Sequence, residues 1–342
     1  MSKKIGGCIF MSRRKYTINK STCSIFAIIC SLLIMLMATA QAAEKQDAPV
    51  WRLDSKPGAV LPRSFRFMTD EFSQSLNPVP SRQGMDALRC SASGEFSGSG
   101  LSMIRDKIYQ HAGKNAVIYI LDLRKESHGF INGDIPVSSY KKKNLDNYSI
   151  SSAAVPQVEE KKLRSIVGRE ITFVPLGNAD TKLLTACNVK VEKAETEEAL
   201  VARLGMNYKR IPVPDQCAPT DEDIDEFMSF YKNLPSDSWL HFHCQAGHGR
   251  TTTFAVFYDI LSNPDVTLED IVARQYALGG TNLFAPGKKN NWKGEEIHKR
   301  AQQVRNFYAY VQANRSNKYA QPYSQWIKAQ NSREDNTKNS ES

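Results

Sequence analysis

Residues 243–251 read His243-Cys244-Gln245-Ala246-Gly247-His248-Gly249-Arg250-Thr251, and this stretch decides the fold that we expect. Residues 238–242 before it are apolar and aromatic, as in a buried strand, and residues 252–261 after it form an apolar run typical of a buried helix. The stretch is therefore predicted to be a strand-to-helix turn. Backbone N–H groups of such a turn, together with the helix N-terminus, form a nest for a phosphate dianion, and the two glycines permit positive φ and close approach.

Cys244 is the predicted nucleophile. At a helix N-terminus beside a guanidinium, a thiol pKa of ~8.5 falls into the range of roughly 3.5–7.5, so the thiolate forms at neutral pH. Arg250 offers a planar fork that matches two phosphate oxygens, and Thr251 can donate a hydrogen bond to the thiolate. The alternative is a buried, inert cysteine. The flanking His243, the glycines and Thr251 favour the catalytic interpretation.

Asp215 is the predicted general acid, 29 residues before Cys244. Prolines at 212, 214 and 219 keep its segment out of a helix until Thr220, which begins a capping box with Asp223. Such a loop can present one carboxyl group to a pocket. An ordinary turn residue after proline is the alternative, and the presence of Cys244 favours the acid.

These residues resemble those of the protein-tyrosine-phosphatase-like inositol polyphosphate phosphatases, or cysteine phytases. The family's loop, His-Cys-x-Ala-Gly-x-Gly-Arg-Thr-Thr, matches residues 243–252, and its acid segment, Asp-His-x-x-Pro, matches Asp215 and Pro219, with Gln216 in place of the usual histidine. Further similar segments, spanning roughly residues 60–312 in all, lie at residues 62–66, 122–129, 279–283 and 292–293. The resemblance implies an α/β, protein-tyrosine-phosphatase-like fold: a central mixed sheet flanked by helices, with a small β-rich inserted domain.

A substrate with several phosphates needs more cations than one loop supplies. The resemblance adds outer residues to the loop, and Asp122 and Glu126 are expected to hold cations and substrate hydroxyls in place. The full predicted substrate-binding set is Gln245, Ala246, Gly247, His248, Gly249, Arg66, Asp122, Arg124, Lys293 and Arg300. For Lys293 and Arg300 a solvated helix face is the alternative. No cluster of metal ligands stands out in the sequence, so neither a metal nor a cofactor is expected.

The composition is that of a globular protein, with 342 residues, 41% of them hydrophobic, and a net charge of +9. Six of the positive charges lie in residues 1–42, which contain no acid. The remainder is only mildly basic, so no nucleic-acid partner is expected. The sequence does not indicate an oligomeric state.

Residues 1–42 are predicted to be a signal peptide. A basic segment precedes the apolar residues 24–38, and Ala40-Gln41-Ala42 is a typical cleavage site. The mature protein would then be exported, periplasmic or secreted, without stable membrane association. An uncleaved anchor is the alternative, because the apolar run approaches the ~20 residues that span a bilayer.

Four cysteines remain after removal of the predicted signal: Cys90, Cys187, Cys217 and Cys244. An oxidising compartment permits a disulfide, but the sequence does not give its connectivity. Cys217 is either a resolving thiol for Cys244 or a buried, unpaired cysteine.

The predicted organisation follows from changes of pattern along the chain. Short β-like runs at 170–174 and 188–191 mark the insertion, and the polar end of the chain is expected to be disordered. The segments are a linker at 43–60, a phosphatase domain at 61–147 and 205–315, a β-rich insertion at 148–204 and a disordered tail at 316–342. Helices are expected at 101–110, 221–233, 250–262, 268–278 and 295–311, and a strand at 116–121.

The sequence thus predicts an exported cysteine-dependent phosphatase that hydrolyses inositol polyphosphates, phytate foremost, through a phosphocysteine. A tyrosine or dual-specificity protein phosphatase is the alternative enzyme, because the loop chemistry does not distinguish leaving alcohols. An exported effector that binds phosphorylated ligands without turnover is the alternative outside enzymes. Arsenate reductases and rhodanese-like domains share the Cys-x5-Arg loop, but they are usually shorter and lack the basic motifs.

Overall fold

A five-stranded sheet carries the predicted loop in the computed structural model, which describes residues 50–141, 145–177 and 180–340. Its strand order is β10-β4-β11-β3-β2, and the first four strands are parallel. Only the short edge strand β2 runs antiparallel, against β3. The bounds are β2 (Arg66–Phe67), β3 (Cys90–Ser93), β4 (Val117–Arg124), β10 (Asn207–Val213) and β11 (Ser238–His243).

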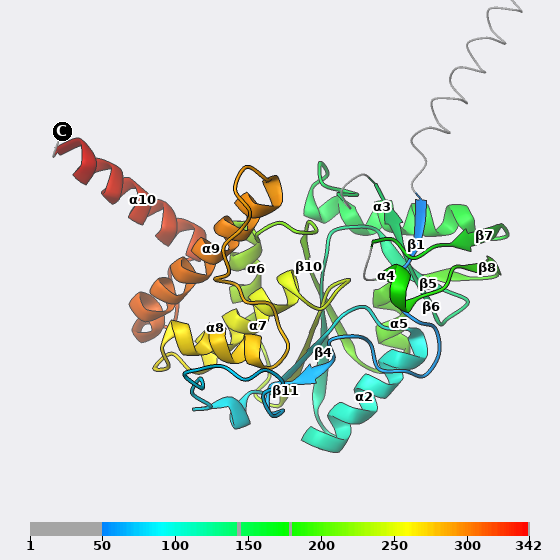
Figure 1. Ribbon diagram of the computed structural model, residues 1–342, viewed down its shortest axis with the longest axis horizontal. Coiled ribbons are helices and arrows are strands. Elements are labelled where there is room, and N and C mark those ends of the chain that lie inside the picture. The colour runs from blue at the N-terminus through cyan, green and yellow to red at the C-terminus, as the bar shows by residue number, and fades with distance from the viewer. Residues whose placement is uncertain (1–49, 142–144, 178–179, 341–342) are drawn as a thin grey trace, which may run out of the picture. The chain divides into compact units, whose positions relative to one another are not determined.

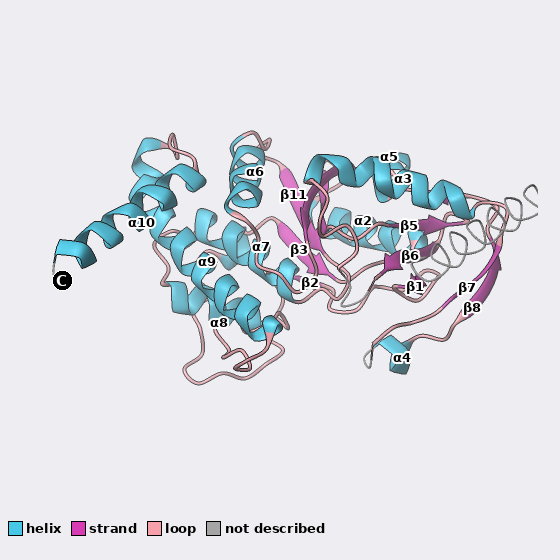
Figure 2. Cartoon of the chain, turned by 90° about the horizontal axis from the view of Figure 1, so that it is seen from above, coloured by secondary structure: helices cyan, strands magenta, loops and turns pink. Residues whose placement is uncertain are grey.

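Helices cover both faces of this sheet, as Figure 2 shows. On one face, Leu121 and Leu123 of β4 pack into a core with α6, α7, α8 and α9, and on the other, Ile118 and Ile120 pack with α2 and α5. This alternation follows from the period of two along a strand. The bounds are α2 (Gly98–Ala112), α5 (Glu197–Arg203), α6 (Asp221–Lys232), α7 (Gly249–Ser262), α8 (Leu268–Ala277) and α9 (Trp292–Asn314).

Side-chain caps fix several helix starts. The predicted capping box of α6 is present: the Thr220 hydroxyl accepts from the Asp223 amide, and the Asp223 carboxylate accepts from the Thr220 amide. Thr267 caps α8 by accepting from the Asp270 amide. Local sequence signals therefore place the start of α6 directly after the segment that contains Asp215.

A second, antiparallel sheet lies beside the first, in the order β1-β6-β5-β9, with a β7–β8 hairpin (Figure 1). Its strands come from β1 (Val50–Leu53), β5 (His128–Ile131), β6 (Ile135–Tyr140) and β9 (Ala194–Glu195), while β7 (Glu170–Phe173) and β8 (Cys187–Lys190) form the hairpin. Helices α3 (Val155–Ile166) and α4 (Asp180–Leu183) belong to the same region, and short 3-10 turns lie at Met85–Ala87, Ser152–Ala154 and Arg315–Asn317. The small β-rich unit is thus wider than the predicted insertion at 148–204, because β1, β5 and β6 lie outside that range.

The structure differs from two expectations about chain ends. Val50–Leu53, expected in a linker, forms β1 by pairing with β6. Helix α10 (Tyr323–Ser340) lies within the segment expected to be disordered, and its Tyr323 and Ile327 are buried against α6 and α9. Two apolar anchors one helical turn apart order a segment whose composition is otherwise polar.

The central mixed sheet flanked by helices confirms the predicted fold class. The predicted signal peptide lies outside the described residues. Among the residues that the structure describes, no helix combines the length and apolar character needed to cross a membrane.

Candidate active site

The carboxyl ends of the four parallel strands bring the chemically active residues together. Cys244 follows β11 directly, Asp215 follows β10, Glu126 follows β4 and Glu95 follows β3. Cys244 is only 2% exposed. The predicted strand-to-helix turn is confirmed, because residues 244–250, here called the phosphate-binding loop, connect β11 to α7.

The two glycines of the phosphate-binding loop have different roles. Gly247 takes a φ of 76°, and a side chain there would also collide with the backbone of Ser93 and Gly94. Gly249 is helical, and a Cβ there would lie 2.9 Å from Nη1 of Arg300. The prediction of positive φ therefore holds for Gly247, whereas Gly249 is needed for close approach by a guanidinium.

Three donors from the segment before β2 and from the start of β2 contact the loop from outside. Arg63 Nη2 donates to the Gln245 carbonyl at 3.1 Å, and the Ser64 hydroxyl donates to that of Ala246 at 3.4 Å. Arg66 Nη1 donates to the Gly247 carbonyl at 3.2 Å. Three successive loop carbonyls thus accept from donors outside the loop, which fits the backbone arrangement of an anion-binding nest.

The thiol of Cys244 has a pKa below the ordinary value. Burial raises this pKa, but the Arg250 guanidinium and the hydroxyl and amide of Thr251 lower it by more, so the net direction is downward. Among the other described cysteines, burial raises the pKa of Cys90 and Cys187, and it raises that of Cys217 to about 11 with help from Glu296. Of the four cysteines that the structure describes, Cys244 alone has the environment of a nucleophile.

Glu126 clamps the guanidinium of Arg250 in a bidentate pair. Its Oε2 accepts from Nη1 at 2.8 Å and its Oε1 accepts from Nη2 at 3.1 Å. Nη1 also donates to the carbonyls of Leu123 and Val213. Arg250 is 2% exposed, and its pKa is raised by Glu126 and Asp215 against the effect of burial. The guanidinium is thus charged and fixed before any phosphate arrives.

Asp215 reaches the same guanidinium from residues 214–219, here called the acid loop. Its Oδ1 accepts from Arg250 Nη2 at 3.0 Å, and its side chain is 20% exposed. Gln216, which replaces the family's usual histidine, takes a φ of 68° and donates from Nε2 to Asp215 Oδ2 at 3.2 Å. A partly exposed carboxyl group held beside the phosphate-binding loop suits a general acid.

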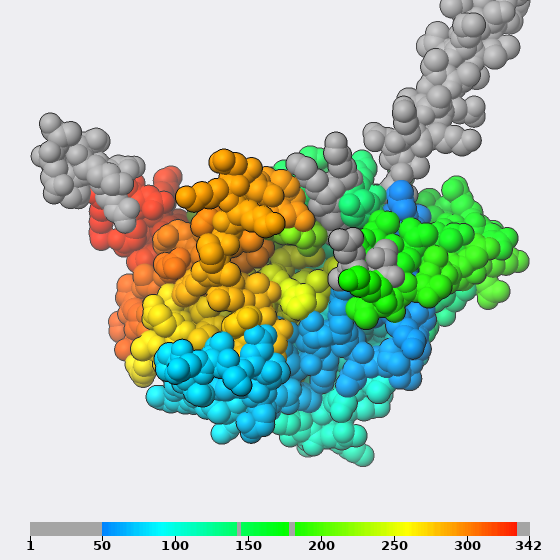
Figure 3. Space-filling model, viewed as in Figure 1, coloured from blue at the N-terminus to red at the C-terminus, as the bar shows by residue number. Residues whose placement is uncertain are grey.

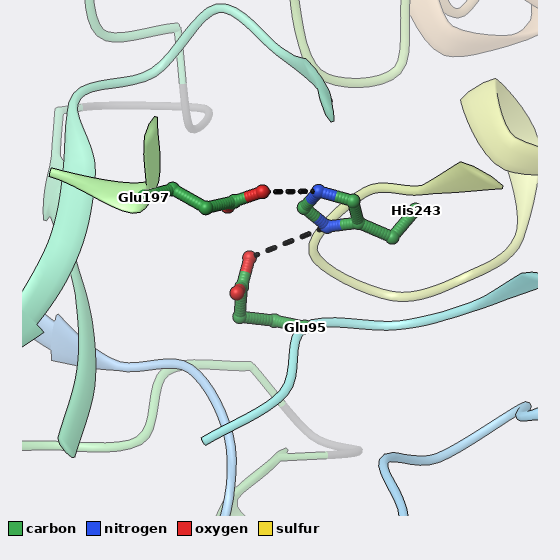
Figure 4. Close-up of side chains that lie close together, drawn as sticks. All are labelled: Glu95, Glu197 and His243. Carbon is green, nitrogen blue, oxygen red and sulfur yellow. Dashed lines mark ion pairs between the residues drawn. The ribbon is translucent and has the colours of Figure 1, made fainter. Parts of the chain in front are cut away.

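His243 lies in a buried ion-pair cluster behind the loop, drawn in Figure 4. Its Nε2 is 2.7 Å from Glu197 Oε1, and its Nδ1 is 3.7 Å from Glu95 Oε2. Burial alone would lower the pKa of His243, but Glu197 and Glu95 raise it to about 9. His243 is therefore a cation at neutral pH, and its place is behind the loop rather than in the phosphate cradle.

Arg124 and Asp122, both predicted to contact the substrate, are fully buried in the structure and are paired with other side chains. Arg124 donates to Glu126 from Nε, to Glu95 from Nη1 and to Asp54 from Nη2. Of the cations that the acids of this block are expected to hold, Glu126 pairs with Arg124, and it also pairs with Arg250. Asp122 pairs instead with His128 and Arg210. A network of buried ion pairs therefore supports the phosphate-binding loop.

Arg66 and Arg300 are also engaged with the protein, being 3% and 6% exposed. Arg66 binds the loop carbonyl described above, and burial lowers its pKa to about 10. Arg300 donates from Nη2 to two acid-loop carbonyls. Both are predicted to bind outer phosphates, and in the structure each donates to backbone carbonyls of one of the two loops. Lys293 and His248 are exposed.

Two groups of acid and imidazole side chains come within metal-ligand range of each other in the part of the chain that the structure describes. They are Glu95, Glu197 and His243, and Asp122, His128 and Glu197. The 2.7 Å between Glu197 and His243 is the separation of a direct ion pair, and the same groups pair with Arg124 and Arg210. We therefore interpret both groups as ion-pair networks.

The sequence reasoning missed Glu95, Glu197 and Arg63. A signal for Glu95 existed, because it follows a short strand that runs parallel to β11. Glu197 lies in the first turn of α5, far along the chain from every residue it pairs with, and the sequence around it gives no sign of its role.

Figure 3 shows the yellow surface around the start of α7 set in a hollow between the blue segment before β2 and the orange segment before α9.

Known proteins share these features. The sequence model of the PTP-like phytase family, described as "Inositol hexakisphosphate", matches residues 121–262. The PTP-like myo-inositol phosphatase of Mitsuokella multacida, solved with myo-inositol-(1,3,4,5)-tetrakisphosphate, is 37% identical with a TM-score of 0.76, over 82% of this chain and 49% of that one. A PTP-like phytase from Bdellovibrio bacteriovorus is 29% identical with a TM-score of 0.64, over 82% of this chain and 94% of that one.

A further relative is "Effector protein hopD2" of Pseudomonas syringae pv. tomato, 27% identical over 208 residues, which are 58% of this chain and 43% of that protein. The chain spans about half the length of the Mitsuokella protein and less than half of the effector. The family model, two solved structures and the geometry of the loop agree. Residues 121–262 thus match the model of the PTP-like phytase family, and 82% of this chain shares the fold of two solved PTP-like phosphatases.

Proposed function

We propose that the protein is a cysteine-dependent phosphatase that hydrolyses phosphomonoesters of inositol polyphosphates, with phytate as the leading substrate. One observation carries the proposal. Cys244, with a lowered thiol pKa, begins a phosphate-binding loop whose Arg250 is clamped by Glu126 and is reached by Asp215. The set holds a nucleophile, an anion clamp and an acid at one edge of the sheet.

The chemistry proceeds in two displacements. The Cys244 thiolate attacks phosphorus in line, so that a P–S bond forms while the P–O bond breaks, and the Asp215 carboxyl group gives its proton to the leaving oxygen. The Asp215 carboxylate then accepts a proton from water as the water oxygen attacks phosphorus. The P–S bond breaks, inorganic phosphate leaves, and the thiolate is restored. Arg250 and the loop amides stabilise the equatorial oxygens in both steps.

The choice of inositol polyphosphates is supported by the Mitsuokella relative, whose solved complex holds an inositol tetrakisphosphate. In this chain the exposed Lys293, at the start of α9, remains the candidate for a phosphate outside the cradle. The test compares phosphate release from phytate with release from a phosphotyrosine peptide. A higher kcat/KM for phytate supports the proposal, and preference for the peptide would replace it with the protein-phosphatase function.

Export remains part of the proposal. It is supported by the basic, apolar and Ala-x-Ala segments of residues 1–42. N-terminal sequencing of the protein recovered outside the cytoplasm should give Ala43 as the first residue. An intact N-terminus in the membrane fraction would instead indicate an anchor.

Binding of phytate without phosphate release would favour the alternative function, an effector that binds phosphorylated ligands without turnover.

A further inference from the structure

Side chains on one face of helix α9 form hydrogen bonds with the backbone of the acid loop. Glu296 Oε2 accepts from the Ala218 amide at 3.0 Å, and Gln303 Nε2 donates to the Pro219 carbonyl at 2.8 Å. Between them, Arg300 Nη2 donates to the carbonyls of Gln216 and Cys217 at 3.0 and 2.9 Å. Residues 296, 300 and 303 follow the i, i+4, i+7 spacing of a single helix face.

Arg300 also lies against the phosphate-binding loop. The Gly249 position faces its guanidinium, and any side chain at 249 would displace it. Burial lowers the pKa of Arg300, and the nearby charge of Arg250 lowers it further, so holding a second cation here has a cost. A buried guanidinium kept between two loops despite that cost points to a role in their relative placement.

The backbone that Arg300 holds is strained. Gln216 takes a left-handed conformation with a φ of 68°, which is unfavourable for a residue with a side chain. Such a conformation persists only where surrounding contacts fix it. Here the Gln216 carbonyl is held by Arg300, and the Gln216 side chain in turn contacts the Asp215 carboxyl group. The contact from α9 therefore acts on the residue next to the general acid.

We propose that Glu296, Arg300 and Gln303 latch the acid loop onto α9, and that Arg300 is a positioning residue that sets Asp215 above the phosphate-binding loop before substrate binds. The proposal rests on the proposed phosphatase function. In this proposal Arg300 holds the residue that delivers the proton, Asp215, and does not bind an outer phosphate. Loss of the latch should impair protonation of the leaving group and leave the attack of Cys244 intact.

The experiment uses two substrates that carry one phosphate each and differ in the leaving group. Phenyl phosphate needs the acid, whereas dinitrophenyl phosphate leaves readily without a proton, and kcat/KM reports the steps up to phosphocysteine formation. Arg300→Met should lower kcat/KM for phenyl phosphate roughly 10- to 100-fold, a share of the 10²–10⁴ that general acid catalysis supplies. For dinitrophenyl phosphate the change should stay within about threefold, because no acid is needed there.

Asp215→Asn should show the same dependence on the leaving group, and Asp215→Asn combined with Arg300→Met should lose little more than Asp215→Asn alone. Glu296→Ala, a milder change to the same latch, should give the same pattern at smaller size. Gln302→Ala is the matched control, because Gln302 is exposed on the same helix and its amide donates to Asn306. It should leave both substrates unchanged.

Three results would overturn the latch. Equal losses on both substrates would mean that Arg300 supports the phosphate-binding loop or the fold. If Arg300→Met kept its kcat/KM on both aryl phosphates but lost activity on phytate, Arg300 would bind an outer phosphate, as the sequence predicts. If the losses of kcat/KM in Asp215→Asn and Arg300→Met added up in the double variant, Arg300 would act independently of Asp215. If the wild-type protein releases phosphate from neither phytate nor the aryl esters, the proposed function itself fails, which is a different outcome.

Discussion

Glu197 Oε1 lies 2.7 Å from His243 Nε2, and this contact joins helix α5 of one face of the sheet to the residue directly before the nucleophile (Figure 4). The other oxygen of Glu197 is 3.1 Å from Nε2 of His128 in β5. A single buried carboxylate thus connects the small antiparallel sheet to the end of β11. Removing one partner of such a buried pair leaves an uncompensated charge.

The His243 pair predicts a dependence of stability on pH. The folded pKa of His243 is raised from 6.5 to about 9, so its contribution to the free energy of unfolding is fully present below pH 6.5 and is lost as pH rises through about 9. Glu95, Asp122 and the His241 ring also face His243. Denaturant unfolding at pH 6.5 and pH 9 should show this loss in the wild-type protein.

Glu197→Gln should be destabilised by about 3–5 kcal/mol at pH 7 and should lose less stability than the wild type between pH 6.5 and 9. Glu198→Gln, a change at the exposed neighbouring residue, is the control and should behave like the wild type. If Glu197→Gln and wild type showed the same pH slope, the His243–Glu197 pair would not be the titrating unit.

The Cys244 thiol should react selectively. Its pKa is lowered, whereas those of Cys90, Cys187 and Cys217 are raised, so iodoacetate near pH 7 should alkylate Cys244 first. Thr251→Val should shift the pH midpoint of alkylation upward by about one unit, because a hydrogen bond to a charged acceptor is lost. Thr251→Ser, which keeps the hydroxyl, should not. An unchanged midpoint in the valine variant would remove Thr251 from thiolate stabilisation.

Arg66 and Lys293 should differ in the substrates they affect. Arg66 is buried against the loop, so Arg66→Met should lower kcat/KM for phytate and for an aryl phosphate by similar factors, roughly 10-fold or more, as a buried carbonyl loses its donor. Lys293 is exposed, so Lys293→Ala should affect phytate alone, by about 10-fold. A phytate-selective loss in Arg66→Met would restore its predicted contact with an outer phosphate.

Chelation tests the interpretation of the acid and imidazole groups as ion pairs. EDTA should leave phosphate release essentially unchanged, and vanadate should inhibit it strongly because it mimics five-coordinate phosphorus. Loss of activity on chelation that a divalent ion restores would show that Glu95, Glu197 and His243, or the group around His128, hold a metal.

The sequence predicted those parts of the site that local pattern determines. The strand, the loop glycines and the helix start around Cys244 are encoded within about twenty residues, and the Thr220 capping box places the end of the acid loop. Asp215 was found because its prolines and its partner Cys244 restrict the choice. These features need no knowledge of which strands pair.

The sequence does not predict the direction in which each long charged side chain points. Arg66, Arg124 and Arg300 carry the charge that a polyphosphate requires, but whether a guanidinium faces solvent or a buried carboxylate depends on strand order. Glu197 lies near His243 only because α5 packs on one face of the sheet, and the pairing of β3 with β11 brings Glu95 to the same place. Helix α10 was missed because two buried residues outweigh a polar composition.

The phosphocysteine is the central claim, and acid-quenched enzyme analysed by mass spectrometry during phytate turnover tests it most directly. The peptide that contains Cys244 should carry a phosphate adduct in the wild-type protein. The adduct should be absent from Cys244→Ser, which should keep less than about a hundredth of wild-type kcat, since a hydroxyl there is a poor nucleophile. Phosphate release without an adduct on Cys244, or a serine variant that turns over at a rate near the wild type, would contradict the mechanism.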